Sequence, residues 1–238
     1  MGIAVETLFT TALGLQAPWV VAKVELDTAK RRIDFEVSCD TKQLPCPACG
    51  VNGQGIHDRI KRSWRHLGFF QFEAWLHAEV PRVDCSACGK TTQAEVPWAR
   101  PGSGFTLLFE ALALSLCQTL PVAQAGGQLR LASKRLWRRI EHYVNLARNR
   151  DDMTGVRVIG IDETSVKKGH QYVTVVHDLE ARRLLFVTPG RDHGTVTAFK
   201  QELTAHGGDA AEIKHACMDI SAAYEGRGRN AARRPNQL

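Results

Sequence analysis

Four of the seven cysteines stand in two matched pairs, at a spacing typical of zinc-binding knuckles. Each pair has the form Cys-x-x-Cys and is followed by a glycine, which suits a tight turn that brings backbone amides close to the sulfurs. The 35-residue spacer between the pairs is long for a zinc ribbon and predicts an inserted hairpin. The alternative is two reduced redox pairs or buried cysteines. We predict one structural zinc ion with four ligands: Cys46, Cys49, Cys85 and Cys88.

A second candidate group is a run of cations, since residues 128–150 hold seven lysines and arginines and a single acid. Ser133 suits the N-cap of a helix within this run. Apolar residues recur in it at helical spacing, at Leu136, Ile140 and Val144, so they share one face. Cations project from the opposite face. We predict that this helix binds DNA through five residues: Lys134, Arg135, Arg138, Arg139 and His142.

A shorter helix precedes this basic helix and completes the pattern of a helix-turn-helix. Pro121 suits its beginning, and we expect Gly126 and Gly127 to close it. A helix pair whose second member is basic outside and apolar inside is the arrangement that lays a recognition helix in the major groove. The alternative is a solvated charged face on an ordinary surface helix.

Two aspartates form the third group. Asp162 follows the apolar run 156–161, and Asp219 lies near the end of the predicted strand 213–220, so we expect each to end a strand of one sheet. Carboxylates at two such strand ends can converge on a divalent metal ion, as phosphoryl transfer requires. The alternative is that both are ordinary residues with which a chain leaves a strand.

The elements that must position these groups fall into three parts. Upstream, residues 20–37 predict two strands around the turn 27–30, and alternating apolar residues from Phe70 to Val80 predict another strand. From Phe105 to about Arg150 the apolar spacing becomes helical. The third part predicts the order strand, strand, strand, helix, strand over these ranges: 156–161, 171–177, 183–187, 195–206 and 213–220.

Composition narrows the class of protein. Apolar residues at 44% and charged residues at 24% are ordinary globular values, which exclude a disordered, collagenous or coiled-coil chain. The net charge of +6 favours an anionic partner. The longest charge-free stretch is too polar for a bilayer span, and the N-terminus does not resemble a secretory signal. We therefore expect a cytoplasmic protein that does not enter membranes, with the three isolated cysteines buried: Cys39, Cys117 and Cys217.

Taken in order, these motifs resemble a known family. Between the cysteine pairs stands Trp64-Arg65-His66-Leu67, and after the basic helix come Gly160-Ile161-Asp162-Glu163 and Lys168-Gly169-His170-x-Tyr172-x-Thr174. Pro189-Gly190-Arg191-Asp192 and Met218-Asp219-Ile220-Ser221 follow. From about Leu13 to Tyr224 the chain resembles a bacterial insertion-sequence transposase of the IS-L-three family, which joins a zinc ribbon, a helix-turn-helix and an acidic-triad catalytic domain.

The resemblance implies an RNase H-like catalytic fold, in which Asp162 and Asp219 match the first two acids of the triad that holds Mg²⁺ or Mn²⁺. It implies DNA transposition, with binding of double-stranded DNA at terminal inverted repeats and metal-dependent cleavage and strand transfer. The expected localisation is cytoplasmic and nucleoid-associated, and a homo-oligomer is compatible with it.

The predicted fold class is therefore α+β with several modules. We expect an N-terminal zinc-ribbon β module with flanking strands at residues 1–100 and a helix-turn-helix module at 101–152. The N-terminal part of an incomplete α/β RNase H-like domain follows at 153–225, and a disordered basic tail at 226–238.

The sequence also departs from the family. Glu225 is the only acid after Asp219, so the third acid of the triad has no counterpart, and the chain turns arginine-rich after Tyr224. We expect a truncated or frameshifted transposase that is inactive; a genuine short homologue is the alternative reading. As to function, the alternatives are a non-catalytic DNA-binding remnant and a zinc-ribbon regulator.

Overall fold

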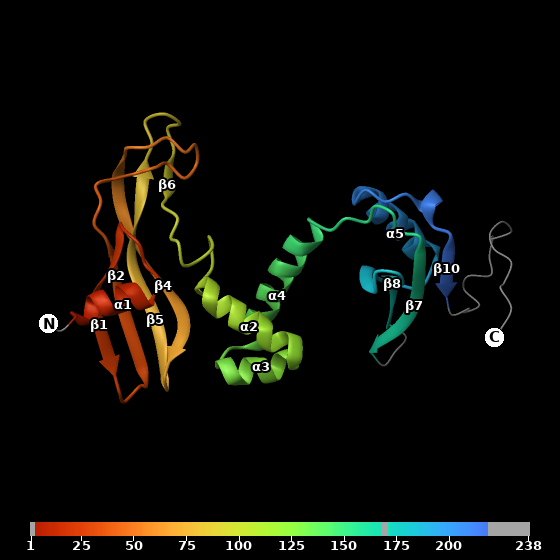
Figure 1. Ribbon diagram of the computed structural model, residues 1–238, viewed down its shortest axis with the longest axis horizontal. Coiled ribbons are helices and arrows are strands. Elements are labelled where there is room, and N and C mark those ends of the chain that lie inside the picture. Colours follow the sequence, from red (N-terminus) through yellow and green to blue (C-terminus); the bar gives the residue numbers. More distant parts are fainter. Residues whose placement is uncertain (1–2, 168–170, 219–238) are drawn as a thin grey trace. The chain divides into compact units, whose positions relative to one another are not determined.

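The computed structural model describes residues 3–167 and 171–218, and the chain divides into two compact units between Tyr143 and Val144. The first unit contains a six-stranded sheet and a helical segment, and the second contains a four-stranded sheet with a helix against it (Figure 1). No helix in the described ranges is long and apolar enough to cross a membrane. Asp219, Glu225 and the basic tail lie outside the described residues.

The sheet of the first unit is built mainly from two hairpins. The strand order is β1-β2-β5-β4-β3, with β6 paired to β5. Strands β2 and β5 run parallel, and the other neighbours are antiparallel. The elements are α1 (Val5–Ala12), β1 (Trp19–Asp27), β2 (Arg32–Cys39), β3 (Gln43–Leu44), β4 (Gln54–Phe69), β5 (Phe72–Asp84) and β6 (Thr91–Gln93).

Alternating apolar residues explain which face of this sheet is buried. Phe35 of β2 and Leu76 of β5 are opposite each other in register, and each is 1% exposed. The hairpin predicted for residues 20–37 is confirmed as β1 and β2, and the hairpin expected between the cysteine pairs is confirmed as β4 and β5. Strand β5 begins at Phe72 because Phe70 occupies the turn, with a φ of 51°.

Three helices follow: α2 (Leu107–Thr119), α3 (Val122–Leu129) and α4 (Ser133–Arg148). Helix α2 presents apolar residues on two sides. Phe109 is 2% exposed in the core between the helices, whereas Leu108 is 56% exposed. Adjacent residues lie about 100° apart around a helix, so both cannot face the same core.

The structure corrects the predicted end of α3. Gly126 and Gly127 lie inside the helix, which runs to Leu129 and is closed by Arg130 in the left-handed conformation, with a φ of 54°. Gly126 serves a close approach instead, because a Cβ atom there would lie 2.7 Å from the carbonyl oxygen of Leu131. The glycine therefore lets the segment before α4 pack tightly against α3.

The second unit has a mixed sheet in the order β10-β7-β8-β9. Strand β10 runs parallel to β7, and the other pairs are antiparallel. Phe199 and Leu203 of α5 pack with Ile161 and Val176 in the core on one face. The predicted order of three strands, a helix and a strand is confirmed over the described residues: β7 (Val158–Lys167), β8 (Gln171–Asp178), β9 (Arg183–Pro189), α5 (His193–Ala205) and β10 (His215–Met218), with a short 3-10 helix at Ala210–Glu212.

Two sequence predictions for this unit are wrong. Asp162 does not end its strand, because Glu163 and the residues after it continue to pair with β8 as far as Lys167. Cys217 is exposed rather than buried, since the side chains of β10, at the edge of the described sheet, are exposed. Cys39 is buried as expected, and Cys117 is half-buried.

Candidate metal centre and nucleic-acid interface

The four paired cysteines converge, and their Sγ atoms all lie within 4.8 Å of one another. The Sγ–Sγ distance is 3.8 Å between Cys46 and Cys88 and 3.6 Å between Cys49 and Cys85. Four sulfurs placed tetrahedrally about 2.3 Å from a zinc ion would lie about 3.8 Å apart. Among the described residues, this is the one cluster of three or more histidine, cysteine, aspartate or glutamate side chains close enough to share a metal ion. Its donor set and dimensions fit a closed four-coordinate metal site.

Both knuckles have the same backbone geometry. The N–H of Gly50 donates to the carbonyl oxygen of Cys46 at 2.8 Å, and the N–H of Gly89 donates to that of Cys85 at 2.9 Å. Gly50 has a φ of 76° and Gly89 a φ of 66°, which is the left-handed region that favours glycine. The turn predicted from each glycine is therefore present.

A glutamine that the sequence analysis missed links the two knuckles. Gln54 is 8% exposed; its side-chain amide donates to the carbonyl oxygen of Asn52 at 2.9 Å, and its Oε1 accepts from the N–H of Ser86 at 2.9 Å. The hydroxyl of Ser86 donates to the same oxygen at 3.1 Å. Gln54 thus holds the chain after the first pair against the second pair. Its position at the start of a strand carries no sequence signal for this role.

The thiols of the cluster differ in acidity. Burial raises the pKa of Cys46, but the backbone N–H groups of Ala48 and Cys49 outweigh it and bring that pKa to about 7. The N–H of Val51 lowers the pKa of Cys49, but the sulfur of Cys85 and burial together raise it to about 12. Negative charges this close repel one another, so the fully ionised set of four thiolates needs a cation among them.

Helix α4 presents most of the predicted DNA contacts to solvent. Lys134, Arg138 and His142 are exposed on its outer side, opposite Leu136, which is 1% exposed. Arg135 is also exposed, and its guanidinium carbon lies 4.6 Å from the centroid of the Phe105 ring. The apolar face predicted for α4 is shorter than expected, because Val144 is 50% exposed.

Arg139, the fifth predicted contact, points inward to a buried carboxylate. Glu110 of α2 is 0% exposed, and its oxygens accept from the hydroxyl of Tyr143 at 2.6 Å and from the guanidinium of Arg139 at 3.4 Å. Ser103 and Arg100 donate to the same carboxylate at 2.7 and 2.9 Å. The buried charge therefore ties α4 to α2 and to the segment before it. The sequence signal was available, since Glu110 is the one charged residue in a mostly apolar helix.

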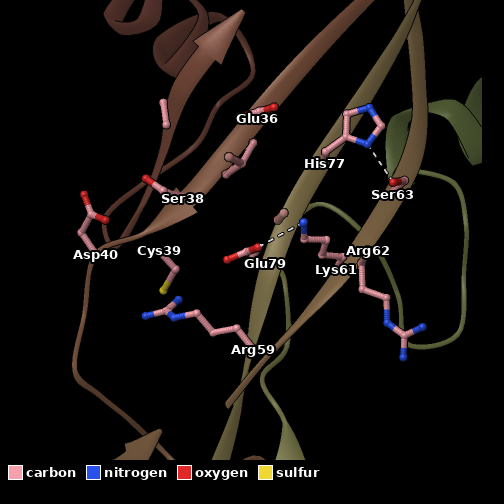
Figure 2. Close-up of a pocket in the computed structure, with 13 residues that line it drawn as sticks. Glu36, Ser38, Cys39, Asp40, Arg59, Lys61, Arg62, Ser63, His77 and Glu79 are labelled. Carbon is pink, nitrogen blue, oxygen red and sulfur yellow. Dashed lines mark hydrogen bonds and ion pairs between the residues drawn. The ribbon is translucent and has the colours of Figure 1, made fainter.

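The first unit also has a polar pocket of about 500 Å³ on the open face of its sheet (Figure 2). Nδ1 of His77 is 2.7 Å from Oγ of Ser63, and its Nε2 is 2.6 Å from Oδ1 of Asp34. Burial opposes ionisation of Asp34, but hydrogen bonds from Arg32 and His77 hold its pKa below the usual value. Three acids and three cations line the pocket, so its charge does not select an anion: Glu36, Asp40, Arg59, Lys61, Arg62 and Glu79.

Of the two aspartates predicted to bind a divalent metal ion, the structure describes one. Asp162 is exposed in the middle of β7, and its Oδ1 accepts from the N–H of Glu163 at 2.8 Å. On the same face its register partner is Val175, whose own partner in β9 is Val187. Asp219, the second predicted ligand, lies outside the described residues.

Three family models match successive parts of the chain. The model described as the zinc-finger of transposase IS204/IS1001/IS1096/IS1165 matches residues 42–88, and the helix-turn-helix domain of transposase family ISL3 matches 94–144. An ISL3 model described as transposase matches residues 159–232. No solved structure matches the chain significantly.

Two curated relatives carry the same description. The transposase for insertion sequence element IS1557 of Mycobacterium tuberculosis is 37% identical over 191 residues, which cover 74% of this chain and 39% of the relative. The transposase for IS1001 of Bordetella parapertussis is 27% identical over 200 residues, covering 82% of this chain and 48% of the relative. The chain thus spans less than half the length of these relatives.

The three matched models follow the order in which the motifs were expected. They coincide with the cysteine cluster, the packed helices α2 to α4 and the mixed sheet, so sequence similarity and geometry agree region by region. The chain belongs to the ISL3 (IS-L-three) family of transposases.

Proposed function

We propose that this chain binds duplex DNA at the terminal inverted repeats of a bacterial insertion sequence, and that its second unit carries part of a metal-dependent centre for DNA cleavage and strand transfer. The observation that carries the proposal is α4, whose outer side is cationic while Leu136 and Arg139 hold its inner side against the helical core. Matched relatives named as transposases support it. The module boundaries that we propose are 1–100, 101–152 and 153–225, followed by a basic tail.

The cysteine cluster, in this proposal, holds one structural zinc ion. The cluster offers four sulfur ligands at distances that fit a tetrahedral site, and a full set of four protein ligands is the pattern of structural rather than catalytic zinc. Bound zinc would cross-link the loop after β3 to the loop after β5 and so stiffen the end of the β4–β5 hairpin. The ion thus supports the fold of the module and takes no part in the chemistry of DNA.

Helix α4 is the proposed recognition helix. The test is fluorescence anisotropy of a duplex carrying the element's terminal sequence, titrated with protein at several salt concentrations. Each lost phosphate contact should reduce the slope of log K against log[salt] by about 0.9, so Lys134→Ala/Arg138→Ala should make it less steep by roughly 2.

The matched control removes two lysines from the β1–β2 hairpin. Lys23 and Lys30 each form an ion pair with an acid on the same hairpin, and Lys23→Ala/Lys30→Ala removes the same formal charge as the α4 variant. We expect the control to keep the slope of the parent protein. Equal losses in both variants would contradict a binding site centred on α4.

For the catalytic centre we propose Asp162 and Asp219 as ligands of Mg²⁺ or Mn²⁺. Strands β7 and β10 pair in parallel with Ile161 opposite Met218. In the sequence each of these two residues is followed by an aspartate. When bound, the divalent ions would stabilise the attacking and leaving oxygens of an in-line phosphodiester displacement. The mixed sheet packed against α5 supports the RNase H-like fold that the family resemblance implies.

We further propose that residues 1–238, tested by themselves, bind DNA without cleaving it. Within these residues Glu225 is the only acid after Asp219, and a two-metal centre needs a further carboxylate to place its second ion. When the protein is incubated with repeat-bearing DNA and Mg²⁺ or Mn²⁺, a protein–DNA complex should form and the DNA strands should stay uncut. Cleavage that disappears in Asp162→Ala would contradict this part alone, whereas failure to bind DNA would contradict the whole proposal. Specific binding to sites away from the element's ends would favour a zinc-ribbon regulator.

A further inference from the structure

The outer side of α4 carries more than cations. Five exposed residues recur at spacings of three and four, which places them on one stripe of the helix: Lys134, Trp137, Arg138, Glu141 and His142. The indole of Trp137 is 57% exposed. It lies one turn after Lys134 and one turn before Glu141, with Arg138 next to it in the sequence. By contrast, three other tryptophans are buried in the core, each no more than 8% exposed: Trp19, Trp64 and Trp98.

The surroundings of Trp137 indicate the chemistry of its partner. A helix that presents an exposed indole beside Lys134 and Arg138 suits a partner in which anionic groups adjoin a less polar surface. Duplex DNA has this pattern in the major groove, where phosphates flank base edges that include the thymine methyl group. Trp137 is the fifth residue of α4, and the N-terminal part of a recognition helix is the part that reaches the base edges.

We infer that Trp137 is a specificity-determining residue that contacts base edges in the major groove, while Lys134 and Arg138 contact phosphates. The inference rests on the proposed DNA-binding function and adds to it the residue that reads sequence. A base contact and a phosphate contact leave different signatures. Losing a base contact lowers the preference for one sequence and leaves the salt slope unchanged, whereas losing a phosphate contact weakens binding to all sequences and reduces the slope.

The experiment uses the full chain with zinc bound. The parent protein first selects duplexes from a randomised pool, and the selected duplex and a scrambled version are then titrated with the parent, Trp137→Ala and Leu108→Ala. Leu108 of α2 is 56% exposed, so its replacement removes a matched exposed apolar side chain from the same helical segment. Acrylamide quenching of tryptophan fluorescence, with and without the selected duplex, provides an independent readout.

We expect Trp137→Ala to bind the selected duplex about 10-fold or more weakly, the loss expected for one base contact, and to bind the scrambled duplex unchanged. Leu108→Ala should keep both affinities. The selected duplex should protect the parent protein from quenching, and this protection should be absent in Trp137→Phe.

Several outcomes would overturn the inference. A parent that selects a sequence, with Trp137→Ala retaining the full preference, would remove Trp137 from the interface and leave the proposed function intact. A lost salt slope in Trp137→Ala would indicate a general disturbance of α4. Loss of self-association in that variant, with DNA preference unchanged, would assign the indole to a second copy of the chain. A parent that binds no duplex would overturn the proposed function and this inference together.

Discussion

The polar groups that we single out in the two units have opposite surroundings. In the first unit, Glu110 is 0% exposed and has four side-chain partners, and the sulfurs of the cysteine cluster lie within 4.8 Å of one another. In the second unit, Asp162 is exposed, and Val187, two strands away on that face, is 43% exposed. Enclosed polar groups must be satisfied by the fold itself, whereas an exposed carboxylate beside exposed apolar surface is available to other molecules.

This contrast separates residues that hold the fold from residues that perform chemistry. If it is right, replacing a cysteine of the cluster or Glu110 will lower the free energy of unfolding, and replacing Asp162 will not. The loss of unfolding free energy should be larger for a group that has more partners within the fold.

The largest effect is expected at the cysteine cluster. Structural zinc sites contribute an apparent ~10–16 kcal/mol in small peptides, largely as folding free energy. Cys85→Ser should therefore abolish binding of one zinc equivalent, measured by metal analysis, and remove hydrogen-exchange protection along β4 and β5. Cys117→Ser, at an isolated half-buried cysteine, is the control and should keep both. A folded β4–β5 hairpin without zinc would contradict the structural role.

The second effect is expected at Glu110. Glu110→Ala leaves the guanidinium groups of Arg100 and Arg139 without their buried partner, and breaking such a pair typically costs about 3–5 kcal/mol. Urea unfolding should show this loss. Glu141→Ala, at an exposed acid on α4, should change the free energy of unfolding by less than about 0.5 kcal/mol. Equal losses of unfolding free energy in both variants would mean that burial of the Glu110 carboxylate does not contribute to stability.

A smaller effect should appear as pH dependence through His66. Burial lowers the pKa of His66 below its ordinary value near 6.5, and its Nδ1 lies 2.9 Å from Oγ1 of Thr106. At pH values between the pKa of His66 in the folded chain and its pKa in the unfolded chain, the unfolded chain binds more protons. The contribution of His66 to the free energy of unfolding is therefore fully present above about pH 6.5 and is lost as pH falls. His66→Gln should flatten this part of the curve of unfolding free energy against pH. The exposed His57→Gln should leave the curve unchanged.

The smallest effect is expected at Asp162. Its carboxylate is exposed and accepts a hydrogen bond from the neighbouring backbone N–H, so Asp162→Asn should change the free energy of unfolding of the second unit by less than about 0.5 kcal/mol. Hydrogen exchange on β7 and β8 measures this unit separately from the first. A loss as large as that of Glu110→Ala would make Asp162 a structural residue and remove the contrast between the units.

The sequence by itself determined the features that depend on local patterns. The cysteine pairs with their glycines, the alternating strands and the order of elements in the second unit were all predicted, because spacing along one chain segment specifies them. The outward position of Lys134 and Arg138 followed from the helical period in the same way.

Only the tertiary structure decided which groups are enclosed and what they contact. Periodicity assigns a residue to a face and says nothing of what covers that face, so Arg139 was grouped with the exposed cations although it contacts Glu110. Gly126 was read as a helix end because a close approach to Leu131 has no local signature. Asp162 was placed at a strand end because the continued pairing of β7 depends on β8, a strand that lies later in the chain.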